Sequence, residues 1–159
     1  MIPNQVKKML DNQHVKYMCI NHSPAFTAQE TAAAAHISGR NLAKIVMIKA
    51  DGKLAMVVLP ANHHVDFGAL RDALGWKNAD LANETEFKKQ FPECEVGAMP
   101  PFGNLYNMPV YVSSWLAMFD QIIFNAGSHS ELIQMAYRDF EKLVKPKVIA
   151  MGKSGGWKH

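Results

Sequence analysis

The chain has 159 residues, of which 48% are hydrophobic and 19% are charged, and its formal charge at neutral pH is +3. This composition excludes a disordered chain, no stretch reaches the roughly 18 apolar residues of a membrane span, and the N-terminus lacks the apolar region of a secretory signal. We therefore expect one compact cytoplasmic domain over residues 1–151, without a membrane partner, followed by a flexible basic tail at 152–159.

The first half of the chain predicts helices and strands in alternation. We expect helices over 3–13, 27–35 and 67–74, and strands over 15–20, 43–48 and 54–59, with the second helix ending at 38–40. Thr27 and Glu30 have the spacing of a capping box, and Asp66 can cap the third helix. Asp51-Gly52 is typical of a tight hairpin turn between the last two strands. These two strands are therefore expected to pair as a central antiparallel hairpin.

The second half predicts shorter elements. We expect helices over 83–91, 114–119 and 137–144, and strands over 109–112, 121–125 and 132–135. Hairpin connections alternate with helices without a regular strand-helix-strand repeat. This order indicates an α+β fold with a mixed, largely antiparallel β-sheet core and flanking helices.

Residues 95–104, Glu-Val-Gly-Ala-Met-Pro-Pro-Phe-Gly-Asn, predict a shaped loop. Pro100 and Pro101 each remove an amide donor and fix φ at about −65°, which excludes a helix interior or a central strand. Gly97 and Gly103 allow a positive φ or a close approach of another molecule to the backbone. Such a loop is either a stiff connector or the rigid wall of a binding site.

Lys44 interrupts an otherwise apolar run over residues 42–48. A lysine is rarely buried in a core without a partner. At a strand start its stem can lie along apolar surface while the ammonium group stays in water. Alternatively, the cation projects into a cleft, where it would orient an ester or a phosphate.

Residues 125–130, Asn-Ala-Gly-Ser-His-Ser, form a second candidate segment after a predicted strand. His129 can exchange a proton near neutral pH, and Gly127 can turn backbone amides toward a ligand. Ser128 and Ser130 add hydroxyl groups. A capped turn with no ligand explains the same residues, so the segment by itself leaves both interpretations open.

The histidines and cysteines give little support to a metal or nucleophile site. His63 and His64 are adjacent, which points their side chains in different directions, and no HExxH pattern is present. Further ligands would have to come from His22, His36 and His129. Cys19 lies in a predicted buried strand, where a small apolar role fits best, and Cys94 has no recognisable signature. We expect no metal and no cofactor.

Five blocks together resemble the YbaK/prolyl-tRNA synthetase-associated editing domain family, in order and in spacing. They are residues 27–32, 42–44, 57–61, 97–103 and 125–127. The resemblance covers about residues 15–144 and implies a mixed β-sheet core and a free-standing aminoacyl-tRNA deacylase. Its implied substrate is the 3′ end of a tRNA that carries a wrong amino acid. A synthetase is a further candidate partner, and DNA is not expected.

The resemblance also assigns roles to residues of this chain. Lys44 matches a lysine that holds the tRNA 3′ end and the scissile ester, and Gly97 and Pro101 match a GxxxP loop that sizes the amino acid. The other implied substrate-binding residues are Ala98, Met99, Pro100, Phe102, Asn125, Ala126, Ser128 and His129. We hypothesise metal-free hydrolysis, with the amide of Gly127 supporting the oxyanion and a tRNA hydroxyl activating the water.

Two departures from the family pattern keep alternatives open. Ile45 stands where the family often has Thr, and Ser113 stands where an Asp is common. A non-catalytic module that binds an aminoacyl-RNA end or a small amino-acid-like ligand would fit these changes. A metal-dependent hydrolase would instead need His63, His64 and His129. Since Ala98 and Met99 are small or apolar, we expect alanine, cysteine or serine as the amino acid removed.

Overall fold

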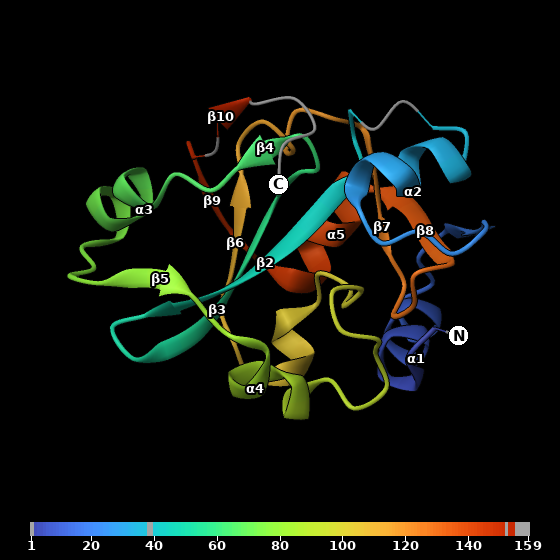
Figure 1. Cartoon of the computed structure of the whole chain (residues 1–159). Coiled ribbons are helices and arrows are strands. Elements are labelled where there is room, and N and C mark those ends of the chain that lie inside the picture. The colour runs from blue at the N-terminus through green and yellow to red at the C-terminus, as the bar shows by residue number, and fades with distance from the viewer. Residues whose placement is uncertain (1, 38–39, 152, 155–159) are drawn as a thin grey trace.

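The computed structural model describes residues 2–37, 40–151 and 153–154, and a five-stranded mixed sheet lies at its centre (Figure 1). In spatial order the strands are β5 (Ala79–Leu81), β2 (Ala43–Ala50), β3 (Lys53–Pro60), β6 (Val110–Ser113) and β9 (Lys147–Ile149). Strands β5, β2 and β3 pair antiparallel, whereas β6 and β9 continue the sheet in parallel. The predicted mixed sheet is confirmed.

The β2–β3 hairpin forms where the sequence predicts it. Asp51 and Gly52 both have positive φ, 46° and 84°, as a two-residue turn between twisted strands requires. Side chains of β3 are buried on both faces of the sheet: Met56 and Val58 pack in one hydrophobic cluster, and Val57 and Leu59 pack in another. This double burial explains why the sequence of β3 is a continuous apolar run rather than an alternating one.

A second sheet has three antiparallel strands in the order β1 (Tyr17–Asn21), β8 (Glu131–Ala136) and β7 (Gln121–Asn125). Leu42 and Ile123 form an isolated parallel bridge that joins this sheet to the start of β2. The bridge is reinforced by Asn41, whose carbonyl accepts a hydrogen bond from the Ile123 amide at 3.0 Å and whose side-chain amide donates to the Gln121 carbonyl at 3.0 Å. These contacts fix β7 beside the start of β2.

Helices cover the sheets on several sides (Figure 1). They are α1 (Asn4–Asn12), α2 (Ala28–Ala34), α3 (Phe67–Leu74), α4 (Glu84–Phe87) and α5 (Tyr137–Val144), with 3₁₀ turns η1 (Lys88–Gln90) and η2 (Gly103–Tyr106). Asp66 caps α3 as predicted, by accepting from the Ala69 amide, and Thr27 caps α2 by accepting from the Glu30 amide. The predicted capping box at Thr27 is only half formed, because the Glu30 carboxylate accepts from the Thr27 hydroxyl at 3.0 Å. No helix in the described ranges is long and apolar enough to cross a membrane.

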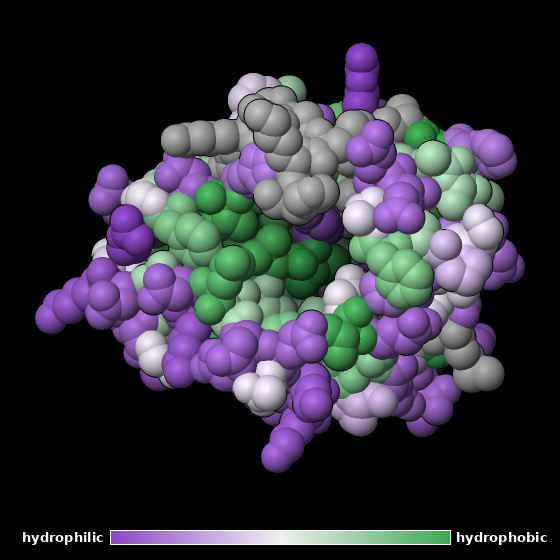
Figure 2. Space-filling model, in the orientation of Figure 1, coloured by the Kyte–Doolittle hydropathy of each residue, from purple (hydrophilic) through white to green (hydrophobic). Residues whose placement is uncertain are grey.

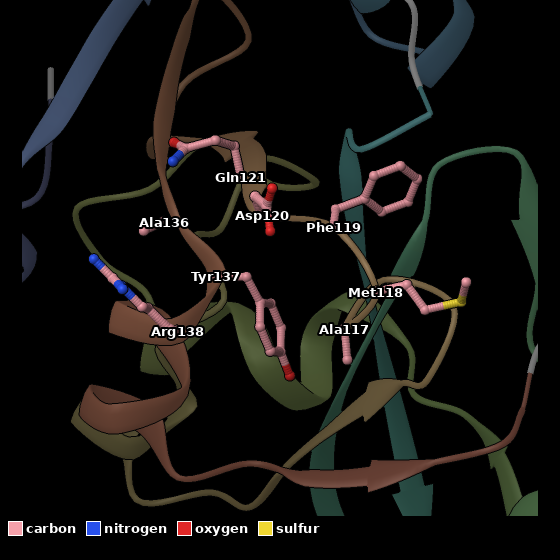
Figure 3. A pocket seen from close by; sticks show the side chains of 8 residues that line it. All are labelled: Ala117, Met118, Phe119, Asp120, Gln121, Ala136, Tyr137 and Arg138. Carbon is pink, nitrogen blue, oxygen red and sulfur yellow. The ribbon is translucent and has the colours of Figure 1, made fainter.

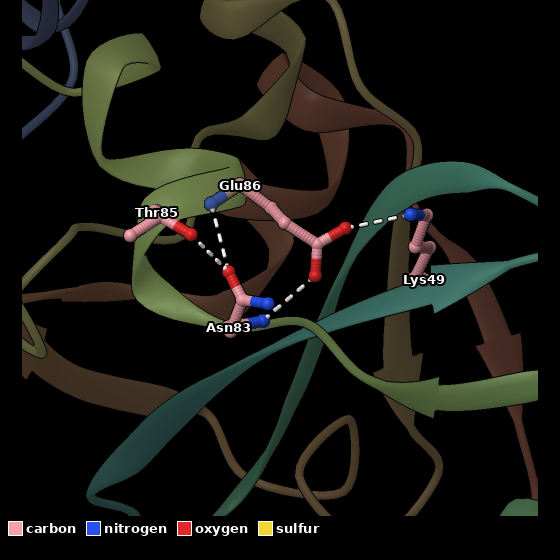
Figure 4. A network of polar contacts seen from close by, with 4 residues as sticks. All are labelled: Lys49, Asn83, Thr85 and Glu86. Carbon is pink, nitrogen blue, oxygen red and sulfur yellow. Dashed lines mark hydrogen bonds and ion pairs between the residues drawn. The ribbon is translucent and has the colours of Figure 1, made fainter.

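The start of α4 is held by a reciprocal network of polar contacts (Figure 4). The Asn83 side-chain oxygen accepts from the Glu86 amide at 3.1 Å, and the Glu86 carboxylate accepts from the Asn83 amide at 3.1 Å. The second carboxylate oxygen of Glu86 lies 2.7 Å from the Lys49 ammonium on β2. A full capping box thus also ties α4 to the central sheet.

The main core lies between the two sheets and α5. Phe102 is fully buried and packs against the rings of Phe124 and Phe140, with ring centroids 5.4 and 5.9 Å apart. Val6 and Leu10 of α1 close the same cluster from one side. On the face drawn in Figure 2, hydrophobic residues also gather in a hollow between α3 and α2.

The structure differs from the predicted elements in several short segments. Residues 114–118 form turns rather than the predicted helix. Strands β5 and β9 are additional to the predicted ones. A further pair is formed by β4 (His63–His64) and β10 (Lys153–Ser154), and β10 lies within the predicted tail. The predicted helix end at residues 38–39 and tail residues 152 and 155–159 lie outside the described residues.

Candidate functional site

A cavity of about 170 Å³ lies at the junction of the two sheets. Its lining residues are Phe26, Thr27, Thr31, Leu42, Ala43, Lys44, Ile45, Ala61, Gly97 and Asn125. Three of the residues that the sequence singled out, Lys44, Gly97 and Asn125, therefore meet at one cavity although they are distant in the chain. We take this cavity as the candidate site and call it the lysine cavity.

Lys44 is the second residue of β2 and pairs with Leu59 across the hairpin. Its side chain is half-buried, and this burial lowers the pKa of its ammonium group from the ordinary value. Among the described residues no carboxylate forms an ion pair with it. A partly desolvated cation without a carboxylate partner favours a negatively charged or strongly polar ligand.

Asn125 ends β7 and contributes a second polar group to the cavity. Its side-chain oxygen is buried and has no hydrogen-bond partner among the described residues. Buried polar atoms are nearly always hydrogen-bonded, so an unpaired oxygen at a cavity indicates a ligand that donates a hydrogen bond. Asn125 can thus accept from an ammonium, amide or hydroxyl group.

The loop over residues 95–104, which we call the Gly/Pro loop, meets the cavity at Gly97, which has φ of 86° and lines it. Residues 98–103 turn into the protein and are buried, with Met99 4% exposed and Phe102 fully buried in the main core. The residues expected to size the amino acid, Ala98, Met99, Pro100, Pro101 and Phe102, therefore do not line this cavity. Their apolar surface stabilises the core, and Gly97 is the part of the loop that faces the site.

The amide of Gly127 has a partner within the protein, which bears on its expected role as an oxyanion donor. It donates a hydrogen bond to the Ala98 carbonyl at 2.9 Å, and the Gly127 carbonyl accepts from the Glu95 amide at 2.8 Å. Ala126 and Ser128 are buried on either side of it. In this structure the turn after β7 thus clamps the Gly/Pro loop and leaves the Gly127 amide no free hydrogen.

His129 contacts the same loop through its ring and its backbone amide. Its Nε2 lies 2.8 Å from the Val96 carbonyl oxygen, its backbone amide donates to the Glu95 carboxylate at 3.3 Å, and its ring packs on Phe26 with centroids 4.7 Å apart. A Cβ at position 97 would lie 3.5 Å from the His129 ring. His129 therefore positions Gly97 and Phe26 at the cavity and does not itself line it.

The alternative metal site does not assemble within the described ranges, where no group of three or more His, Cys, Asp and Glu side chains could hold an ion. His63 is buried beside Trp115, and His129 is engaged by the loop. Cys19 is exposed, contrary to the buried role expected for it. Burial raises the pKa of the Cys94 thiol to about 11, which disfavours the nucleophilic thiolate.

Sequence reasoning missed part of the cavity lining. The sequence assigns Thr27 to a helix start and Thr31 to the helix that follows, and both residues keep these roles. The Thr31 hydroxyl donates to the Thr27 carbonyl at 2.9 Å. Phe26 is 71% exposed, which is unusual for a phenylalanine and is a signal only the structure provides. Ala61 follows Pro60 at the end of β3, and its small size leaves the space that forms the cavity.

A larger hollow of about 400 Å³ lies elsewhere on the molecule (Figure 3). Its lining residues are Ala117, Met118, Phe119, Asp120, Gln121, Ala136, Tyr137 and Arg138. None of the residues predicted to be functional lies in it, and Figure 3 shows the side chains of Tyr137 and Met118 pointing in different directions. This hollow offers no converging chemical groups of the kind found at the lysine cavity.

Fold and cavity together define the class of the protein: an α+β domain with a small lysine-lined site and no cysteine or metal centre among its described residues. The family model for the aminoacyl-tRNA editing domain matches residues 22–143. The chain belongs to that family. The family resemblance, the predicted fold class and the expected enzyme class, an aminoacyl-tRNA deacylase, are thereby confirmed.

Relatives with curated descriptions support the same family. The prolyl-tRNA editing protein ProX of Acetoanaerobium sticklandii is 25% identical over 145 residues, which cover 86% of each chain. The multifunctional Ser/Thr-tRNA deacylase ProXp-y of Escherichia coli K12 is 26% identical over 110 residues, which cover 67% of this chain and 65% of the relative.

Solved structures confirm the fold. A hypothetical protein of known crystal structure superposes with a TM-score of 0.83 at 18% identity, over 94% of this chain and all of the other. A protein described as a candidate trans-editing enzyme for prolyl tRNA synthetase gives a TM-score of 0.78 at 18% identity, over 94% of this chain and 95% of the other. At such low identity this likeness extends to the fold and no further.

Proposed function

We propose that this chain is an aminoacyl-tRNA deacylase that removes a small, wrongly attached amino acid from tRNA in the lysine cavity. The observation that carries the proposal is the meeting of Lys44, Gly97 and Asn125 at one cavity of about 170 Å³. Each of these residues supplies something that ester hydrolysis needs: a cation, an accessible backbone and a hydrogen-bond acceptor.

The size and lining of the cavity favour a small amino acid. Ala43 and Ala61 leave room for a short side chain, and the Thr31 hydroxyl adds a polar contact. Alanine, serine and cysteine fit these dimensions, while each additional methylene would cost roughly 1–3 kcal/mol where space is lacking. The name of the Escherichia coli relative refers to serine and threonine, which agrees with a lining that contains a hydroxyl.

Lys44 positions the substrate. Its ammonium binds the phosphate or ester oxygen at the tRNA 3′ end, and partial burial strengthens that attraction relative to an exposed lysine. Asn125 accepts a hydrogen bond from the α-ammonium group of the amino acid, which uses the oxygen that otherwise lacks a partner. The two groups together would hold the scissile ester between them.

Hydrolysis then needs no nucleophile from the protein. A water oxygen attacks the ester carbonyl carbon, the bond from that carbon to the ribose oxygen breaks, and the ribose oxygen receives a proton. Aminoacyl esters are already activated, so orientation of the water and support of the developing oxyanion supply the acceleration. A neighbouring ribose hydroxyl activates the water. Since the Gly127 amide is bonded to Ala98, we assign oxyanion support to Lys44 and to the Gly97 amide at the cavity.

The test is a deacylation screen of the purified protein on tRNAs charged with alanine, serine, cysteine, threonine and a bulky residue such as phenylalanine, with and without a chelator. We expect loss of ester from one or more of the small aminoacyl-tRNAs, little from the bulky one, and no effect of the chelator. Binding of the charged tRNAs with every ester intact would contradict the proposal and establish a binding module instead.

A further inference from the structure

A second cavity of about 340 Å³ lies next to the lysine cavity. Its lining residues are Arg40, Pro60, Asn62, His63, Trp115, Met118 and Phe119. The same two chain segments, residues 40–45 and 60–63, contribute to both cavities, and the charge of Lys44 is close enough to His63 to help lower the pKa of that imidazole. A ligand large enough to leave one cavity would therefore enter the other.

His63 gives this second cavity an unsatisfied polar group. The residue is 8% exposed, and its Nδ1 is buried without a hydrogen-bond partner among the described residues. Burial, followed by the charges of Lys44 and His64, lowers the pKa of the imidazole and keeps it neutral near pH 7. A neutral imidazole can donate or accept at Nδ1, so it can pair with a hydrogen-bond acceptor or with a hydrogen-bond donor of a ligand.

The remaining lining is aromatic and unusually exposed. Trp115 is 53% exposed and Met118 is 73% exposed, and the indole meets the His63 ring edge-on at a centroid distance of 6.0 Å. Phe119 and Asn62 complete a surface that combines ring faces with hydrogen-bonding groups. A purely aliphatic ligand would cover the rings but leave the buried His63 nitrogen unpaired.

We propose that this second cavity holds the terminal nucleobase of the RNA whose aminoacyl group occupies the lysine cavity. The inference rests on the proposed function. A planar heterocycle stacks on an exposed indole and presents ring nitrogens and amino groups to His63 and Asn62, as single-stranded RNA bases do on aromatic side chains. The ribose then spans the two cavities at Pro60 and Ala61, beside Lys44.

The experiment compares two fluorescently labelled, uncharged RNA minihelices by polarisation. One ends in a 3′ adenosine, and the other ends in the same nucleotide without its base. The wild-type chain is measured beside Trp115→Ala and beside Trp115→Phe, which keeps an aromatic ring. Leu81→Ala is the control, because it removes another exposed apolar side chain elsewhere on the molecule.

We expect the wild type and Leu81→Ala to bind the adenosine-ended RNA about tenfold more tightly than the abasic one, the size of one stacked base. Trp115→Ala should lose this preference by weakening the adenosine-ended RNA alone, and Trp115→Phe should retain most of it. Equal binding of both RNAs by the wild type, or an undiminished preference in Trp115→Ala, would overturn the inference. The deacylase proposal is tested by a different result, since intact esters in the deacylation screen would contradict it whatever the RNA-binding experiment shows.

Discussion

At the scale of single residues, the site depends on polar atoms that the fold leaves without partners. Lys44 has no carboxylate partner within the described residues, and the Asn125 side-chain oxygen has no donor there. Groups of this kind cost stability in the free protein and recover it when a ligand binds. Both residues could be singled out from the sequence, but the unpaired state that indicates their role is a property of the three-dimensional structure.

Asn125→Ala is expected to separate binding from folding. Because the side-chain oxygen makes no internal hydrogen bond, its removal should leave the melting temperature unchanged or slightly raised. The loss of one hydrogen bond to a charged ammonium group, about 1.5–3 kcal/mol, should lower kcat/KM for deacylation roughly 10- to 100-fold. A variant with normal kcat/KM would remove Asn125 from the site.

Gly97→Ala is expected to destabilise the loop through its backbone. Gly97 has φ of 86°, a conformation that costs an L-residue about 1–2 kcal/mol, although an added Cβ would meet only ordinary contacts. Gly68→Ala in α3 is the matched control and should stabilise the protein by about 0.5–1 kcal/mol. Urea unfolding measures both, and equal effects of the two substitutions would contradict the explanation.

At the scale of elements, the sequence predicts those whose signals are local. Asp51-Gly52 sets the β2–β3 hairpin, and Asp66 starts α3, because a turn or a cap is decided by a few neighbouring residues. Strands β4, β5 and β9 are two or three residues long and exist through pairing with distant segments, so they leave no periodic pattern to detect. Residues 114–118 form turns and not the predicted helix, because Ser113 holds them: its hydroxyl accepts from the Trp115 amide and its carbonyl accepts from the amides of Leu116 and Ala117.

The link between α4 and β2 gives a pH-dependent prediction. The Lys49 ammonium, and then the Asn83 amide, lower the pKa of Glu86 from its ordinary value of 4.5. The ionised carboxylate therefore stabilises the fold above pH 4.5, and this contribution is lost as the pH falls through the lowered pKa. Glu86→Gln should be less stable than the wild type at pH 7, and the two should converge in acid when unfolding is followed by circular dichroism. A constant difference across the pH range would exclude Glu86 as the titrating group.

At the scale of the whole molecule, the two sheets and their connecting bridge bring distant residues to one cavity. Lys44, Gly97 and Asn125 could be proposed together from sequence because their blocks resemble a known family. The inward turn of residues 98–103 could not, since a Gly/Pro loop has no periodicity that shows which side chains enter the core. We therefore propose that the lining of the cavity, and not Met99, selects the amino acid.

We consequently expect Met99→Ala to change the stability of the protein and Ala61→Val to change its amino-acid preference. Met99 is 4% exposed in the main core, so its truncation should cost about 2–4 kcal/mol in the free energy of unfolding and leave amino-acid preference unchanged. Ala61→Val adds bulk at the cavity and should reduce kcat/KM for the larger accepted amino acids about tenfold or more. A folded Met99→Ala protein with a changed amino-acid preference would contradict this expectation and show that the Gly/Pro loop selects the amino acid.

Deacylation by Lys44→Ala tests the central claim most directly. Lys49→Ala is the matched control, because Lys49 lies on the same strand and is exposed outside the cavity. On the best substrate from the screen, we predict that Lys44→Ala hydrolyses no faster than buffer while its melting temperature stays near that of the wild type, and that Lys49→Ala keeps its activity. Near-normal hydrolysis by a folded Lys44→Ala protein would contradict the account.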